Sequence, residues 1–218
     1  LGFPIRKRAN APSSFSVPIK KCIGVDRPRA SSEPYIPHPV IEEQTYREIL
    51  TALQNMALVM ERSPSSFHSM KEEDIRTHFL VQLNGTFEAD ATGETFNHKG
   101  KTDILIRHNK ANLFIAECKF WGGRKKFLDT VDQLLGYLTW RDSKTALIVF
   151  ARETTISTVE ANAIEALRSH PNFVSEVNAN GPYNFRCRMR SERDESVSLD
   201  VALQIYDVPT RESQCGCR

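Results

Sequence analysis

Apolar residues recur along the first half of the chain with the period of helices. From Ile41 to Glu61 they return at steps of three and four residues, which is the spacing of one helix face, and Pro64 ends that helix. A second helix is expected from Ser69 to Gly85, with Glu72 three residues after Ser69 in a capping-box pattern. Two helices are therefore predicted before the first strand.

Three extended stretches follow, parted by turn residues. They cover Phe87–Phe96, Lys101–His108 and Asn112–Phe120, and they predict a meander of three strands. The third stretch carries apolar side chains on both faces between Leu113 and Ala116. That pattern is typical of a central strand covered on both sides.

Helix and strand patterns alternate after the meander. The expected elements are a helix, a buried strand, another helix and a late hairpin, over Lys125–Trp140, Thr145–Phe150, Thr155–His170 and Tyr183–Arg190 with Val197–Asp207. Between Ser69 and Phe150 the order is helix, three strands, helix, strand. The prediction is an α/β fold with a mixed central sheet flanked by helices.

Composition bounds the class of protein. The chain has 218 residues, 40% of them hydrophobic and 26% charged, which suits one buried core with an appendage. No apolar run approaches the about 20 residues that a membrane span needs. Five cysteines are few and odd in number, which favours a reducing, cytoplasmic compartment. Because the chain begins with Leu1 rather than Met, we expect an excised or processed piece of a longer protein.

Charge and proline content divide the chain into four parts. Residues 1–40 hold seven Lys/Arg and two Asp/Glu, a net +5, and are rich in proline, whereas residues 41–218 hold 22 and 25, a net −3. We interpret residues 1–40 as a basic arm or linker, and favour a solvated linker over an arm that lies on nucleic-acid phosphates. Residues 41–68 form a covering helix, 69–207 the main domain and 208–218 a tail.

Three charged residues of the meander are candidates for chemistry. Glu117 and Lys119 lie two apart on the third strand and so share a face. Asp103 starts the preceding strand and can fall beside Glu117 if the two strands pair. Two neighbouring carboxylates repel unless a cation neutralises them, and Mg²⁺ accepts such a pair together with waters and phosphate oxygens. The alternative is a surface salt bridge, but charges at the end of an apolar strand are costly to bury without a role.

This pattern resembles the PD-(D/E)xK nuclease superfamily, whose restriction-endonuclease-like core has the same order of elements. The motif falls on Thr102-Asp103 and, after thirteen residues, Glu117-Cys118-Lys119, with Thr102 in place of the name-giving proline. Gln133 and Tyr137 resemble the QxxxY motif of the RecB-like branch. The resemblance implies metal binding by Asp103 and Glu117, water activation by Lys119, and support of the site by the Gln133–Tyr137 pair.

Further residues are weaker candidates. Members of the branch often add an acid from the first core helix, and here Glu73 is preferred to Glu72, which the capping box already explains, with Glu94 third. Phosphate contacts are expected from the basic residues after Gly122-Gly123, which are Arg124, Lys125 and Lys126. Two aromatic residues, Trp121 and Trp140, could stack on bases or pack in the core. Cys118 points to the opposite face and is interpreted as core.

The resemblance implies a function, which we state as an expectation. It is a Mg²⁺-dependent deoxyribonuclease, with Mn²⁺ as a substitute metal, in a prokaryotic restriction, phage-defence or repair system. DNA is favoured over RNA by the resemblance alone. A homodimer and further domains of a larger chain are expected partners, since a double-strand cut usually needs two sites. The alternatives are a non-cleaving nucleic-acid-binding or assembly module of the same fold, and a nuclease that awaits a missing partner domain.

Overall fold

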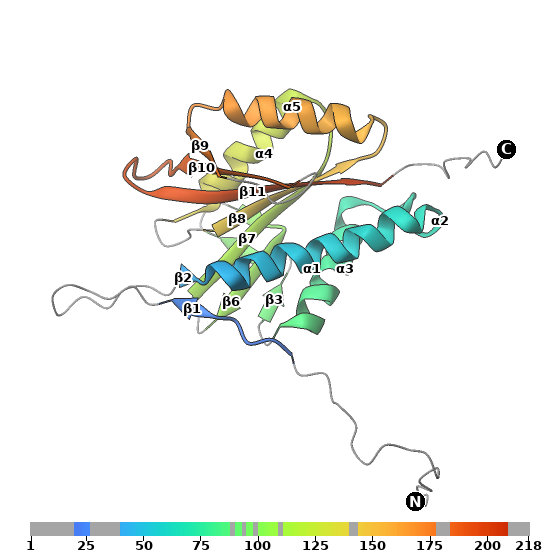
Figure 1. The fold of residues 1–218 in the computed structure, drawn as a ribbon, viewed down its shortest axis with the longest axis horizontal. Coiled ribbons are helices and arrows are strands. Elements are labelled where there is room, and N and C mark those ends of the chain that lie inside the picture. The colour runs from blue at the N-terminus through green and yellow to red at the C-terminus, as the bar shows by residue number, and fades with distance from the viewer. Residues whose placement is uncertain are drawn as a thin grey trace, which may run out of the picture.

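The computed structural model describes residues 20–26, 40–87, 90–92, 95–97, 100–108, 111–139, 144–177 and 184–208. A central sheet of seven strands separates two layers of helices (Figure 1). One layer holds α1 (Glu43–Arg62), the short α2 (Pro64–Phe67) and α3 (Glu72–Thr86), and the other α4 (Arg124–Tyr137) and α5 (Ile156–Arg168). The chain is an α/β protein with a mixed sheet packed against helices, as the sequence predicts.

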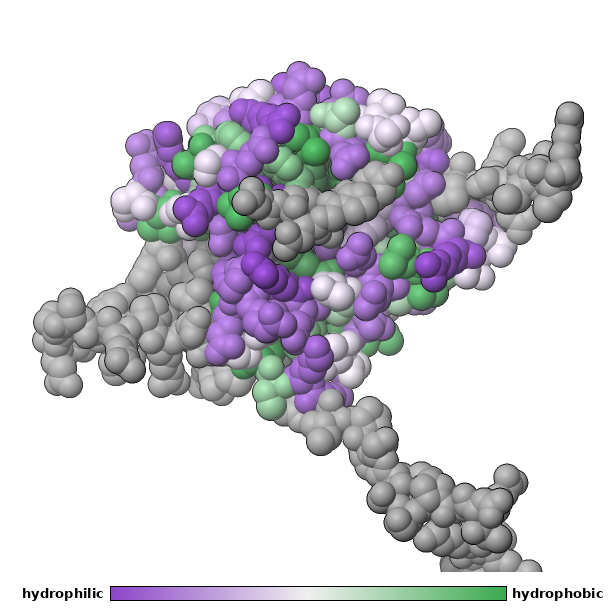
Figure 2. Space-filling view, in the orientation of Figure 1, coloured by the Kyte–Doolittle hydropathy of each residue, from purple (hydrophilic) through white to green (hydrophobic). Residues whose placement is uncertain are grey.

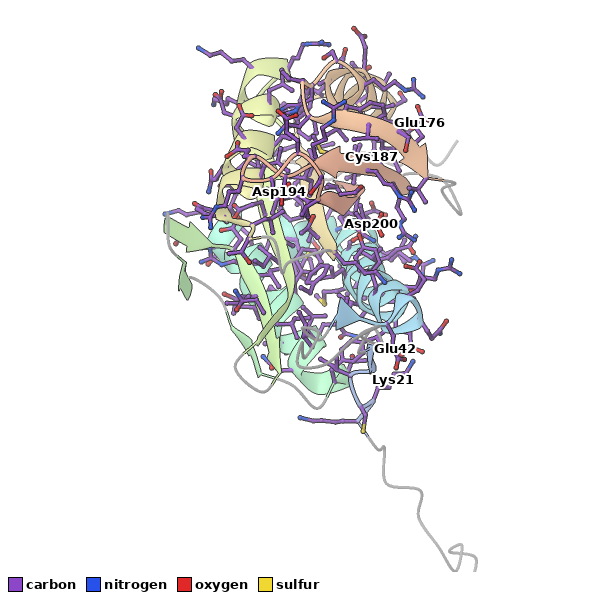
Figure 3. The ribbon with its side chains drawn as sticks, turned by 90° about the vertical axis from the view of Figure 1, so that its left-hand side faces the viewer. Lys21, Glu42, Glu176, Cys187, Asp194 and Asp200 are labelled. Carbon is purple, nitrogen blue, oxygen red and sulfur yellow. The ribbon has the colours of Figure 1, made fainter. Side chains whose placement is uncertain are left out.

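The sheet has antiparallel ends and a parallel centre. Its order is β3-β6-β7-β8-β11-β10-β9. The pairs β7–β8 and β8–β11 are parallel and the others antiparallel. The bounds are β3 Asp90–Thr92, β6 Ile104–His108, β7 Ala111–Phe120, β8 Lys144–Ala151, β9 Phe173–Val177, β10 Asn184–Arg190 and β11 Ser198–Asp207. Figure 3 shows the last three strands side by side, marked by Glu176 on β9, Cys187 on β10 and Asp200 on β11.

Strand β7 is the central strand that the sequence predicts. Its residues Leu113 to Cys118 are all buried. Phe114, Ala116 and Cys118 belong to the core beneath α1 and α3, while Ile115 belongs to the core beneath α4 and α5. Because side chains alternate along a strand, Glu117 and Lys119 share the face of Ile115, on the side of α4.

The predicted first strand of the meander is broken in two. Its piece β3 pairs with β6, but β4 (Thr95–Asn97) instead pairs with β5 (Gly100–Thr102) in a separate two-stranded hairpin. Asn97 pairs with Gly100, so the two strands are local neighbours and the chain leaves the main sheet before it returns at β6. Strand β9 was not predicted: most of its side chains are exposed, so it carries no buried apolar pattern.

The expected arm is ordered against the body over a short stretch. Val25–Asp26 forms β1, which pairs with β2 (Val40–Ile41), and Ile23 is buried. The sequence did not predict this strand pair, because a strand of two residues carries no periodic signal. Residues 1–19 and 27–39 of the arm, and the tail from residue 209, lie outside the described residues.

The surface gives no sign of an apolar interaction face in the part that the structure describes. Three large hydrophobic side chains are exposed, Val59, Val81 and Val174, and they lie on three different elements. Figure 2 shows mostly hydrophilic residues on the visible face, with hydrophobic residues scattered among them. Within the described ranges, no helix combines the length and the hydropathy needed to cross a membrane.

Candidate active site

The end of β7 extends beyond its neighbour β6. The pairing of β6 with β7 ends at Ile104 and Ala116. The residues of β7 after Ala116 pair with no described strand on that edge, although they pair with β8 on the other edge as far as Phe120. Two side-chain carboxylates take the place of the missing strand. The N–H of Cys118 donates to Asp103 Oδ2 at 2.8 Å, and the N–H of Phe120 donates to Glu72 Oε2 at 2.7 Å.

Asp103 is held on both carboxylate oxygens. Besides the N–H of Cys118, it receives a hydrogen bond and ion pair from Arg76 Nη1 to Oδ1 at 2.9 Å. The two side chains are only 20% and 12% exposed. Asp103 lies between β5 and β6, so the sharp change of sheet at this residue places its carboxylate beside β7. The predicted neighbourhood of Asp103 and Glu117 is present.

Glu117 is the most unusual group of the site. It is 1% exposed and is the single Asp or Glu among the buried residues of the described ranges. Gln133 Nε2 donates to its Oε2 at 3.2 Å, but its Oε1 is buried without a hydrogen-bond partner. Burial, and next the charge of Asp103, raise the pKa of Glu117 from 4.5 to about 9. Without a cation, Glu117 is therefore protonated at neutral pH.

Lys119 lies on the same face of β7, two residues further on. Its Nζ pairs with Glu72 Oε1 at 3.3 Å, and its side chain is 42% exposed. Partial burial lowers the pKa of Lys119, but the Glu72 carboxylate outweighs it, so the pKa lies above its ordinary value of 10.5. Lys119 is accordingly a fixed ammonium cation at the edge of the site.

The QxxxY pair comes from α4 and reaches Glu117. Gln133 Nε2 donates to Tyr137 OH at 2.8 Å as well as to Glu117, and Tyr137 is buried. Burial, and then the charge of Glu117, raise the pKa of Tyr137 above 10. The two side chains therefore brace the buried carboxyl from the side of α4.

Helix α3 supplies Glu72, and not Glu73, to this cluster. Glu73 is exposed, while Glu72 contacts both Lys119 and the main chain of β7. The sequence favoured Glu73 because Glu72 was assigned to a capping box with Ser69. The helix instead begins at Glu72, and its cap is formed by Asp74, which accepts the N–H of Lys71 at 2.9 Å. The carboxylate of Glu72 is thus left for the site.

The three side chains expected to contact phosphate point in different directions, because successive residues of α4 are rotated about the helix axis. Arg124 is held on α5, with Nη1 at 3.1 Å from Glu165 Oε1 and Nη2 at 2.6 Å from Ser169 Oγ. Lys126 lies seven residues before Gln133, or about two helical turns, and so shares its face. Lys125, the residue between them, is exposed. Lys126 is the residue best placed to extend the site.

The other sequence candidates do not join the cluster. Trp121 packs against Phe127, with ring centroids 5.7 Å apart, as the core alternative predicts. Cys118 is buried on the opposite face of β7, also as expected. Glu94 and Trp140 lie outside the described residues.

Two arginines that lie near the site were not among the residues predicted from the sequence. Arg76 holds Asp103, and its signal was its place four residues after Glu72, on the same face of α3. Arg152 lies over the Phe120 ring, 3.8 Å from its centroid, and Nη2 donates to the Met70 carbonyl at 2.7 Å. Nothing in the sequence pattern marks Arg152, because it lies after a buried strand and outside the motifs of the site.

A surface hollow of about 290 Å³ lies elsewhere, and none of the predicted site residues lines it. His170 is buried in its wall, with Nε2 at 2.9 Å from Asp132 Oδ1. The N–H of Asn172 donates to Nδ1 at 3.1 Å. Since both ring nitrogens are engaged, His170 offers no free base there.

The donor set of the cluster fits a divalent cation. A buried carboxylate oxygen without a donor lies beside a second carboxylate, and a hard cation would satisfy both in place of the proton on Glu117. Asp103 and Glu117 would hold it. Within the described residues, no group of three or more His, Cys, Asp or Glu side chains is arranged to hold a metal. A site of two carboxylates with waters and phosphate oxygens is the arrangement typical of Mg²⁺.

Comparisons of this chain with protein families, with curated proteins and with solved structures find no match. The chemical interpretation therefore depends on the geometry of the cluster and on the sequence motifs.

Proposed function

We propose that this chain is a metal-dependent nuclease that hydrolyses phosphodiester bonds. The observation that carries the proposal is Glu117: a buried carboxyl with one oxygen unpartnered, beside Asp103, and with Lys119 next on the same strand face. A protein gains no stability from such a group, because the unpaired oxygen costs about 1–3 kcal/mol. Groups perturbed in this way by burial and a like charge are typical of catalytic sites.

The fold supports a nuclease of the PD-(D/E)xK type. Helix α3, the antiparallel β3-β6-β7 set, α4 and the parallel strand β8 follow one another in the order of the restriction-endonuclease-like core. The QxxxY contacts of Gln133 and Tyr137 support its RecB-like branch. On that resemblance we propose DNA as the substrate, in a cytoplasmic restriction, phage-defence or repair system. A homodimer and further domains remain predictions.

Each residue of the cluster has a separate task in the proposed reaction. When bound, Mg²⁺ or Mn²⁺ supplies Lewis-acid chemistry, polarising a phosphate oxygen and favouring ionisation of water. Asp103 and Glu117 would bind this cation, and Arg76 and Gln133 hold these two side chains in place. The ammonium of Lys119 favours the ionised form of the attacking water and offsets the charge that develops on the phosphate oxygens.

Cleavage assays test the proposal. Supercoiled plasmid, linear duplex, single-stranded DNA and RNA are incubated with Mg²⁺, Mn²⁺ or EDTA, using wild type, Lys119→Ala and the exposed neighbour Glu73→Gln as a control. We expect metal-dependent cutting that Lys119→Ala lowers by about 100-fold or more and Glu73→Gln retains. Equal cutting by the wild type and Lys119→Ala would contradict the proposal.

The scarcity of ligands favours a second candidate, a non-cleaving binding or assembly module. The site offers Asp103 and Glu117 as metal ligands, and no group of three or more His, Cys, Asp or Glu side chains in the described part of the chain could hold a metal. Such a module would bind nucleic acid equally well with EDTA or Mg²⁺ and would cut in neither. A nuclease that awaits a partner domain would instead bind Mg²⁺ through Glu117 while it does not cut.

A further inference from the structure

Glu72 uses both oxygens of its carboxylate within the site. Oε2 accepts the N–H of Phe120 at 2.7 Å, and Oε1 lies 3.3 Å from Lys119 Nζ. The side chain thus joins the last main-chain donor of β7 to the ammonium beside it. Both oxygens of Glu72 are therefore engaged by groups of β7, one by the main chain and one by a side chain.

The ion pair with Glu72 restricts the motion of the Lys119 side chain. A lysine has a long, rotamer-rich side chain, and fixing it costs up to about 2 kcal/mol of conformational entropy. Lys119 is substantially exposed, and the ion pair with Glu72 holds its Nζ at the cluster. Glu72 is itself fixed by the hydrogen bond from Phe120, so it can direct Lys119.

The rest of α3 strengthens this arrangement. Arg76 follows Glu72 by four residues and so lies one turn along the same helix face. It holds Asp103 at 2.9 Å. One face of α3 therefore contacts both strands of the site, β7 through Glu72 and the start of β6 through Asp103.

We propose that Glu72 is a positioning residue that acts through Lys119, and that the metal set is limited to Asp103 and Glu117, so that the site takes one divalent cation. The inference deepens the proposed nuclease function and depends on it. It assigns the third carboxylate of the cluster to the lysine instead of to a second metal ion.

Glu72→Gln separates the two contacts of this residue. Its amide oxygen can still accept the N–H of Phe120, so the end of β7 keeps its cap, but the charge that holds Lys119 is lost. Glu72→Ala removes both contacts and reports the structural part. Glu73→Gln makes the same chemical change one residue along, on an exposed side chain, and is the matched control.

Binding of Mn²⁺ to the whole chain, followed by electron paramagnetic resonance, tests the ligand assignment. We expect one ion per chain, a Kd within about threefold of wild type for Glu72→Gln, and a loss of about 10-fold or more for Glu117→Gln. A loss in Glu72→Gln as large as in Glu117→Gln, or two ions in wild type and one in Glu72→Gln, would overturn the inference and leave the proposed function standing. Absence of Mn²⁺ binding by wild type would overturn the proposed function and the inference with it.

Chemical labelling tests the action through Lys119 without any need for cleavage. The rate at which acetic anhydride acetylates Lys119 is measured by mass spectrometry, with Lys125 of the same chain as internal reference. We expect Glu72→Gln to raise the relative rate at Lys119 about two- to fivefold, and Glu73→Gln to leave it unchanged. An unchanged rate in Glu72→Gln would show that Lys119 is not held by Glu72 and would overturn the inference.

Discussion

The N–H of Cys118 donates to the carboxylate of Asp103 at 2.8 Å, across 15 positions of sequence. This bond closes the gap left where β6 ends and β7 continues. It also holds the carboxylate of Asp103, a candidate metal ligand, against β7, the strand that carries Glu117 and Lys119. The spacing between the parts of the motif is therefore set by sheet geometry: Asp103 must stand where β6 begins, beside the end of β7.

Replacing Arg76 is expected to destabilise the protein. Arg76→Met leaves Asp103 as a largely buried carboxylate without its cation, and breaking a buried pair costs about 3 kcal/mol. Arg76→Lys keeps a charge but not the planar donor fork, so its loss should be intermediate. Urea unfolding of the three proteins at neutral pH measures this, and a change below about 0.5 kcal/mol for Arg76→Met would contradict it.

The stability of the metal-free protein should fall as the pH rises. Glu117 has a pKa of about 9 in the folded chain against 4.5 for an ordinary glutamate, so the folded state binds one proton more between these values. This contribution is complete below the unfolded pKa and is lost as the pH rises through the folded pKa. Within this window it lowers the free energy of unfolding by about 1.4 kcal/mol per pH unit.

Glu117→Gln removes that titration and keeps nearly the same shape. In EDTA we expect the free energy of unfolding of the variant to exceed that of wild type by an amount that grows from about pH 6 to about pH 9. Taking the difference between the two proteins cancels the other titrating groups, and Glu73→Gln gives the effect of charge removal at an exposed position. Parallel profiles for wild type and Glu117→Gln would show that Glu117 is ionised throughout.

Much of the fold could be predicted because its signals are local. The helix face of α1 and the doubly apolar stretch of β7 follow from the period of their residues alone. The break between β3 and β4 could not be predicted, since it depends on which partner each strand meets. Strand β9 is an exposed edge strand held by β10, and its residues carry no pattern of their own.

The site was predictable where residues are linked by sequence spacing. Glu117 with Lys119, and Gln133 with Tyr137, are joined by the periods of a strand and a helix. Glu72 was placed after Glu73 because a capping box and a tertiary contact compete for the same carboxylate, and only packing decides between them. The spacing of Arg76 from Glu72 placed it on the same helix face, but its partner Asp103 lies on another element, and sequence spacing does not link the two.

Binding of the cation should release a proton. Because Glu117 is protonated at neutral pH without a metal, the ion must displace that proton, and its apparent affinity should rise about tenfold per pH unit below a pH of about 9. Calorimetric titrations in two buffers of different ionisation enthalpy count the protons, and we expect about one per ion at neutral pH. An affinity for the ion that does not change with pH would mean that the ion does not bind to Glu117.

The basic residues at the start of α4 should differ in their effect on DNA binding. Lys126→Ala is expected to weaken binding and to reduce the salt dependence by about one phosphate contact, whereas Arg124→Ala is not, since Arg124 is held by Glu165 and Ser169. Fluorescence anisotropy at several salt concentrations measures both. Equal losses in the two variants would show that Arg124 leaves α5 to bind DNA.

Gly122 offers a second way to move Lys126. A Cβ at this position would collide with Lys126 Cδ, and the flexible lysine would yield. Gly122→Ala should therefore mimic Lys126→Ala in DNA affinity, and the double variant should be no weaker than either single one. Additive losses would mean that Gly122 acts on binding by another route.

A calorimetric titration of Mg²⁺ into the metal-free chain at about pH 8 tests the proposed metal site, because at that pH the proton on Glu117 competes about tenfold less than at neutral pH. We expect saturable binding of one ion per chain in wild type and its loss in both Asp103→Asn and Glu117→Gln. Saturable binding that survives unchanged in both variants, or no binding by wild type at millimolar Mg²⁺, would contradict it.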